Sequence, residues 1–215
     1  MENVQARSRF GMRAVAVGVL AVGTGFTPLA LGQTIVDEWG SVKAPPPPEL
    51  KPVTINPKET ALLMLDFLKQ NCPPRPRCLA SLPKVQNLLT QAREKAVLVV
   101  HSLAGQTVAD ILPEVAARAG EPVVSSGPDK YLNTDLEKIL KEKGVKTVIV
   151  VGTAAEGAVL NTASQSALRG FKVIVPVDGM SSATTYAEQY TAWHLANSPR
   201  VGPQVTLTRT ELIGY

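Results

Sequence analysis

The sequence predicts an α/β fold with a mostly parallel sheet of five or six strands and helices on both faces. Two observations favour it. From residue 60 onward, short apolar runs of the kind found in strands buried on both faces alternate with segments of helical periodicity. The spacing of five or six such strand–helix units is typical of parallel sheets with crossover helices. In such sheets ligands bind at the carboxyl ends of the strands.

Six apolar segments are expected to form the strands. The first is apolar throughout until it reaches Asp66, and the third and last are short. The segments are residues 60–66, 96–101, 122–125, 146–151, 171–178 and 205–208.

Five segments are expected to be helical. Residues 82–95 carry an apolar stripe, with Ser81 as a cap before Pro83. Thr134 and Glu137 form a capping-box pattern that opens a helix ending at Gly144. The other three helices are expected over residues 109–119, 157–168 and 185–196.

The first 32 residues predict a signal peptide. Arg7, Arg9 and Arg13 precede an apolar run over residues 14–23, and small residues at 30 and 32 suit a cleavage site. A membrane anchor is the alternative, but the run is short, interrupted by glycine and followed by Pro28. We therefore expect an exported protein, periplasmic or secreted, with no stable membrane span after cleavage.

The remaining chain divides into a proline-rich arm and one domain. Residues 33–58 include four consecutive prolines and are expected to be extended, so the domain covers residues 59–215. Loss of three arginines and one glutamate with the signal lowers the formal charge from +4 to +2. Without a cluster of basic residues and interleaved aromatics, no nucleic-acid partner is expected.

Cys72 and Cys78 are the only cysteines, and their spacing in an exported chain favours a disulfide over free thiols. A catalytic Cys72 thiol remains a third option. A zinc site needs more ligands than these cysteines and the two histidines, so no metal and no cofactor is expected.

Several motifs resemble those of the isochorismatase-like hydrolases, which include nicotinamidases and other cysteine amidohydrolases. The resemblance runs over about residues 60–213. It rests on Leu65-Asp66, on Thr134-Asp-Leu, on VGTAAEGAVLNTA at residues 151–163 and on GFKVIVPVDG at 170–179. It implies a three-layer α/β sandwich that assembles as a homo-oligomer.

The resemblance also implies a site built from an Asp base, a charge-stabilising Lys and a Cys nucleophile. Asp66 matches the base, but the position of the Cys falls on Ala158. The family spacing places Ser125 where the Lys is expected. Lys130 follows five residues later, either reaching the pocket or remaining a solvated loop charge.

The missing thiol closes the acyl-enzyme route at the usual position. True isochorismatases in the family also have a small residue there, and they cleave a vinyl ether by protonation and attack of water. An Asp held near a Lys can carry out acid–base chemistry of that kind.

The other polar residues at strand ends have other expected roles. Glu156 is either a second acid–base group or a carboxylate stabilised by the helix N-terminus. His101 is expected as a hydrogen-bonded wall of the pocket, and Asp178 as a support for the corner of the site. Ala155, Gly157, Ala158 and Ser125 complete the expected pocket.

These observations predict an exported hydrolase of a small organic molecule, with Asp66, Lys130 and Glu156 as catalytic residues. The alternative is a catalytically inactive protein that binds a small molecule, or acts as a scaffold, on the same fold. Tyr186, Tyr190, Trp193 and His194 are expected to pack in the core or in an interface.

Overall fold

The computed structural model describes residues 34–215, so the expected signal peptide lies outside the described residues. The described chain divides into two units, residues 34–44 and Pro45–Tyr215. In the first unit the described residues form a short helix, α1 (Ile35–Glu38), and a 3-10 turn, Trp39–Ser41. All other elements belong to the second unit.

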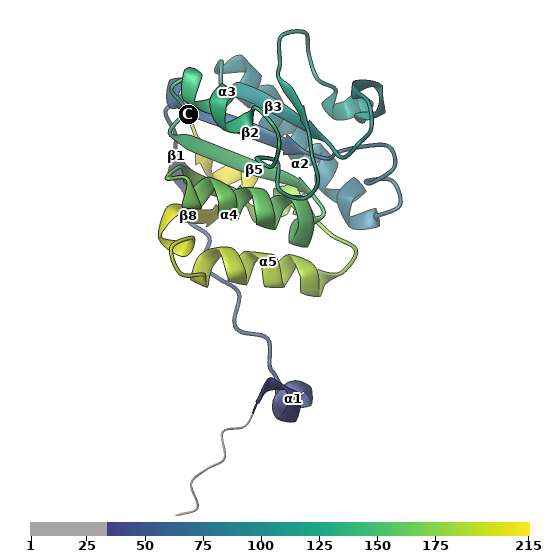
Figure 1. Cartoon of the computed structure of the whole chain (residues 1–215), viewed down its shortest axis with the longest axis vertical. Coiled ribbons are helices and arrows are strands. Elements are labelled where there is room, and N and C mark those ends of the chain that lie inside the picture. Colours follow the sequence, from purple (N-terminus) through teal and green to yellow (C-terminus); the bar gives the residue numbers. More distant parts are fainter. Residues whose placement is uncertain (1–33) are drawn as a thin grey trace, which may run out of the picture. The chain divides into compact units, whose positions relative to one another are not determined.

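The second unit is built on a seven-stranded parallel sheet, which confirms the predicted α/β class (Figure 1). Its order is β4-β3-β2-β5-β6-β8, and β7 pairs with β5. The strands are β2 (Thr60–Leu65), β3 (Leu98–Leu103), β4 (Val123–Ser125), β5 (Thr147–Thr153), β6 (Lys172–Pro176), β7 (Met180–Ser181) and β8 (Val205–Thr208). The predicted sheet lacked only β7, which is two residues long.

The central strand β2 explains the continuous apolar run in the sequence. All six of its residues are buried, because β3 and β5 flank it and helices cover both of its faces. Leu63 packs into a cluster that includes residues of α3 (Leu136–Glu142), α4 (Leu160–Leu168) and α5 (Thr185–Asn197). Leu62 packs on the opposite face, against α2 (Pro76–Glu94). The result is a three-layer sandwich.

Helix α2 starts six residues before the expected position, because Pro76 occupies its first turn, where no backbone N–H is needed. Pro83 lies inside the helix, opposite the carbonyl of the exposed Leu79. Ser81 is therefore not a cap: its hydroxyl donates to the Cys78 carbonyl at 2.8 Å.

The helix predicted over residues 109–119 is wrong. The structure has two 3-10 turns instead, Val108–Asp110 and Pro113–Val115. Pro113 lacks a backbone donor and disfavours the helical conformation of Leu112, which has a ψ of 138°.

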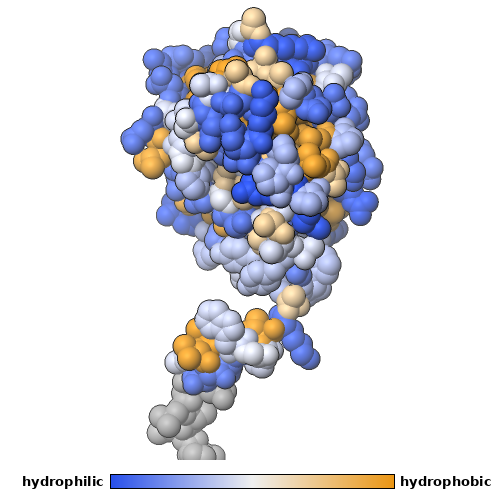
Figure 2. All heavy atoms as spheres, turned by 90° about the vertical axis from the view of Figure 1, so that its right-hand side faces the viewer, coloured by the Kyte–Doolittle hydropathy of each residue, from blue (hydrophilic) through white to orange (hydrophobic). Residues whose placement is uncertain are grey.

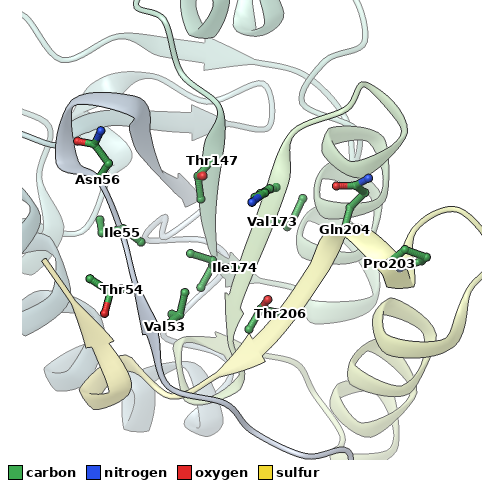
Figure 3. Close-up of a pocket in the computed structure, with 11 residues that line it drawn as sticks. Val53, Thr54, Ile55, Asn56, Thr147, Val173, Ile174, Pro203, Gln204 and Thr206 are labelled. Carbon is green, nitrogen blue, oxygen red and sulfur yellow. The ribbon is translucent and has the colours of Figure 1, made fainter.

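The segment expected as an extended arm is only partly extended. Residues 35–41 are helical. Residues 45–58 belong to the second unit, where β1 (Val53–Thr54) pairs in parallel with β9 (Ile213–Gly214). A hollow of about 400 Å³ separates β1 from the amino ends of β5 and β6 (Figure 3). Within residues 34–215 no helix is long and apolar enough to cross a membrane.

Candidate active site

Asp66 lies at the carboxyl end of β2, between the ends of β3 and β5. It adopts a left-handed backbone conformation with a φ of 54°, which aspartate tolerates better than most residues. Its side chain is buried, with 5% of the residue exposed. The central position of β2 therefore places one carboxylate inside the edge of the sheet where ligands bind.

Two side chains hold the Asp66 carboxylate. Ser102 Oγ donates to Oδ1 of Asp66 at 2.6 Å, and Ser102 Oγ also accepts a hydrogen bond from the Asp66 backbone N–H at 3.2 Å. Lys130 Nζ lies 2.8 Å from Oδ2. The site is thus a Ser102–Asp66–Lys130 cluster, in which the lysine offsets the charge of the aspartate.

Lys130 is fully buried, so of its two alternatives the solvated loop charge is wrong. Besides Asp66, its ammonium donates to the Leu103 carbonyl at 3.2 Å and to the Ser126 carbonyl at 3.0 Å. These three acceptors match the three N–H groups of an ammonium. Lys130 therefore forms an ion pair with the Asp66 carboxylate, and all three of its N–H donors have acceptors within the protein.

The loop after β4 accounts for the position of Lys130. The chain turns at Asp129, whose carboxylate accepts the Tyr131 N–H at 2.9 Å. Thr134 Oγ1 then donates to the Lys130 carbonyl at 2.5 Å instead of closing the predicted capping box. Ser125 is the exposed last residue of β4 and accepts the Gly105 N–H at 3.3 Å, and within residues 34–215 no hydrogen bond joins it to Asp66.

The turn after β5 forms the other side of the site. Gly152 packs so closely on β2 that a Cβ there would lie 2.5 Å from the Leu65 Cβ and carbonyl oxygen. The chain then enters a π-helical turn, Ala155–Val159, which continues into α4. Ala155 and Ala158 are buried and Gly157 is half-buried, so these three positions offer neither a thiol nor a hydroxyl.

Glu156 is exposed at this turn. Its Oε2 accepts a hydrogen bond from Ser182 Oγ at 2.6 Å. Within residues 34–215 no hydrogen bond joins it to Asp66 or Lys130. The structure therefore brings Lys130, but not Glu156, into direct contact with the predicted base.

Asp178 lies in a 3-10 turn after β6 and contacts other elements. It accepts the Thr210 N–H at 2.9 Å and lies 3.0 Å from Lys84 Nζ of α2. It thus joins the turn before β7 to α2 and to the C-terminal segment. Tyr186, Tyr190 and Trp193 are at least 40% exposed, so they do not pack in the core, and their packing in an interface stays a prediction.

Ser102 contacts Asp66 but is not among the site residues predicted from the sequence. The strand-end rule selected His101, but successive side chains in a strand point to opposite faces. Ser102 contacts Asp66, whereas His101 Nε2 lies 3.0 Å from Glu121, which Arg93 also binds. Because β3 is buried on both faces, its apolar residues do not show which of the two adjacent polar side chains faces Asp66.

Burial lowers the pKa of His101 from its ordinary value of 6.5, although Glu121 opposes this effect. Burial alone would raise the pKa of Glu121, but hydrogen bonds from Arg93, the Arg118 backbone and His101 lower it from 4.5 to about 2. For both groups the unfolded chain binds protons more readily than the folded one. Their contributions to stability are therefore present at neutral pH. That of His101 is lost as the pH falls below 6.5, and that of Glu121 as it falls from 4.5 through about 2.

We accordingly expect Glu121→Gln to weaken the acid dependence of stability. The variant should lose about 1–2 kcal/mol at pH 7, a figure reduced for solvent screening of this partly buried carboxylate, and little at pH 3. Thermal melts from pH 3 to pH 7 measure the difference. Glu211→Gln, which alters an exposed pair, is the control, and equal acid slopes in wild type and Glu121→Gln would contradict the assignment.

Cys72 and Cys78 are joined by a disulfide with an S–S distance of 2.08 Å. This bond removes the option of a catalytic Cys72 thiol. The loop that it closes carries Arg75, whose Nη1 donates to the Asn71 carbonyl at 2.9 Å and to Thr153 Oγ1 at 3.4 Å. Within residues 34–215 no group of three or more His, Cys, Asp or Glu residues is placed to hold a metal ion.

Residues 60–209 match the family model described as the isochorismatase domain. The chain belongs to the isochorismatase family. Membership in this family of hydrolases agrees with the resemblance of the sequence motifs and with the parallel sheet that carries the Ser102–Asp66–Lys130 cluster.

Two relatives illustrate the range of this family. "Secreted isochorismatase effector Isc1" of Verticillium dahliae is 33% identical over an alignment of 113 residues, and the match covers 47% of this chain and 60% of that protein. The chain thus matches less than two thirds of that relative. "Maleamate amidohydrolase" of Pseudomonas putida is 27% identical over 149 residues, covering 55% of this chain and 70% of that protein.

Solved structures of the family share the fold. An isochorismatase-like hydrolase from Alkaliphilus metalliredigens has a TM-score of 0.64 at 24% identity, covering 71% of this chain and 95% of its own. A cysteine hydrolase from Pseudomonas syringae pv. phaseolicola has a TM-score of 0.67 at 20% identity, with 76% and 94% covered.

Proposed function

We propose that this isochorismatase-family chain is an exported hydrolase of a small organic molecule, acting through Asp66 and water without a cysteine nucleophile. The observation that carries the proposal is the buried Ser102–Asp66–Lys130 cluster at the carboxyl edge of the sheet. A buried carboxylate with an ammonium partner and a hydroxyl donor is an arrangement suited to proton transfer.

In the proposed reaction Asp66 removes a proton from a water molecule, and the water oxygen attacks an electrophilic carbon of the substrate. The bond from that carbon to the leaving group breaks, and Asp66 returns the proton to the leaving group. Each carboxylate oxygen has a second lone pair for this proton, since Ser102 and Lys130 use one each. Lys130 offsets the charge of Asp66, and Ser102 fixes its orientation.

Two observations support a water-based route. The chain has only two cysteines, and both lie in the disulfide, so no thiolate is available to form an acyl intermediate. The buried positions of the turn after β5 are alanines, Ala155 and Ala158.

Export rests on different observations. The N-terminal sequence has the charge, apolar run and small-residue site of a signal peptide. The relative from Verticillium dahliae bears the name of a secreted effector. Both support a hydrolase that acts outside the cytoplasm.

We expect Asp66→Asn to lower the rate of hydrolysis by about 10²–10⁴-fold, because the amide cannot take a proton from water. The measurement is turnover of a panel of ethers, amides and esters, with a thermal melt to show that the variant is folded. Asp135→Asn is the matched control, since its carboxylate is exposed and makes no capping bond. If every activity of the wild type survives in Asp66→Asn, the proposed mechanism is wrong.

A second candidate function is binding without turnover. The observation that favours it is that all three N–H groups of Lys130 have acceptors inside the protein, so no lysine donor is free to stabilise charge on a substrate. Thermal-shift screening separates the two functions. A ligand recovered unchanged after long incubation favours binding, and any product of turnover excludes this candidate.

A further inference from the structure

Arg75 stands out because it lies in a constrained loop beside the candidate site. The loop runs from Cys72 to Cys78 and is closed by the disulfide, and Pro74 and Pro76 flank the arginine. Proline fixes its own backbone φ and restricts the residue before it. The backbone that presents Arg75 is therefore held in one arrangement before any ligand binds.

The guanidinium group reaches the carboxyl edge of the sheet. Its Nη1 donates to Thr153 Oγ1, and Thr153 is the last residue of β5. The strand pairing aligns Leu65 with Gly152, so Thr153 and Asp66 are the next residues of two adjacent strands. Arg75 also donates to Asn71, whose side-chain amide lies 3.5 Å from the Asp66 carbonyl. Arg75 thus borders the residues that carry the base.

The remaining donors of Arg75, which is half-buried, have no protein acceptor within residues 34–215. Within residues 34–215 no carboxylate pairs with Arg75, although Arg77 in the same loop pairs with Glu188, and Arg93 with Glu121. Within residues 34–215, only Nη1 of Arg75 donates hydrogen bonds, so no protein acceptor in that range occupies the edge formed by Nε and Nη2. Two parallel N–H donors on one edge of a guanidinium match the two oxygens of a carboxylate.

The local charges favour an anion at this edge. Lys130 offsets Asp66, and Glu188 is paired with Arg77. Glu156 forms no salt bridge with the residues that the structure describes, and it accepts a hydrogen bond from Ser182. Figure 2 views the molecule from the side on which α5 begins, and most of that face is hydrophilic, with apolar side chains in small groups. A polar, charged ligand suits such a surface.

We infer that Arg75 is the specificity-determining residue of this site and binds a carboxylate group of the substrate through its Nε and Nη2 donors. The inference rests on the proposed function in that it assigns a substrate class, small carboxylic acids, to the Asp66 site. Recognition and chemistry are separate here, because Arg75 holds the carboxylate while Asp66 and water act on another carbon of the same molecule.

The test is binding of benzoate, malonate and maleate, each compared with its neutral amide, by titration calorimetry at constant ionic strength. We expect the wild type to prefer at least one carboxylate, and Arg75→Gln to weaken its binding by roughly 10–100-fold while leaving the amide unchanged. Arg77→Gln is the matched control, since it removes a charge from the same disulfide loop at a paired position. Arg75→Lys should restore only part of the affinity, because lysine cannot donate in parallel from one edge.

Three results would overturn the inference: no carboxylate preferred over its amide, equal loss in Arg75→Gln and Arg77→Gln, or inorganic phosphate bound as well as the best carboxylate. Failure of the proposed hydrolysis is distinguished by Asp66→Asn. That variant should keep the carboxylate preference even where turnover is lost, since the binding measurement requires no reaction.

Discussion

Replacing Lys130 with methionine is expected to lower the free energy of unfolding by about 3–5 kcal/mol, the usual range for breaking a buried ion pair from one side. The reason is the environment of its ammonium. The side chain is fully buried and contacts Asp66 together with the carbonyls of Leu103 and Ser126. Methionine fills a similar volume but leaves a buried carboxylate and two buried carbonyl oxygens without that donor.

Denaturant unfolding monitored by circular dichroism measures this loss. Lys138→Met on α3 is the control, because its side chain is exposed and it should change stability by less than about 0.5 kcal/mol. The double variant Lys130→Met/Asp66→Asn should recover part of the stability, because it removes the unpaired charge. A Lys130→Met protein as stable as the control would show that the pair is not buried in solution.

The second large effect is expected at Gly152. A methyl group there would lie 2.5 Å from both the Cβ and the carbonyl oxygen of Leu65, closer than real Cβ atoms approach. Backbone cannot yield as a flexible side chain does, so the ends of β2 and β5 must separate. We expect Gly152→Ala to lower the free energy of unfolding by about 2–3 kcal/mol.

The same substitution should also lower activity, because Asp66 directly follows Leu65 and would move with it. Gly127→Ala is the matched control, since a Cβ at that glycine meets nothing within 4 Å. Thermal melts and turnover are measured on both variants. Native stability in Gly152→Ala would mean that the two strands do not approach as closely as described.

The sheet could be predicted from the sequence because its central strands are short runs that are apolar on both faces and alternate with longer helical segments. Strand β7 was missed since two residues carry no periodicity. The helix expected over residues 109–119 was wrong because Pro113 outweighs the alanine-rich composition around it. In a short segment such as residues 109–119 a single proline determined the secondary structure, whereas in the strands of the sheet the pattern of buried residues determined it.

The site was predictable to a smaller extent. Asp66 followed from its place at the end of a buried strand. Lys130 could not be assigned, since the path of the loop after β4 depends on two contacts of the Lys130 backbone. Its N–H donates to Thr162, which is distant in sequence, and its carbonyl accepts from Thr134. Assigning Ser102 required knowing which of the two adjacent polar residues, His101 or Ser102, points toward Asp66. The sequence alone does not show this, because β3 is buried on both faces.

The Cys72–Cys78 bond has a consequence for where the protein can work. Cysteine hydrolases depend on a reduced thiolate, which oxidants convert to inactive forms. This chain has both of its cysteines in the disulfide, and the base that we propose is an aspartate, so the conditions that close its loop would disable a thiol enzyme but not this site. An aspartate-based site of this kind is compatible with an oxidising environment, in which its Arg75 loop is also kept intact.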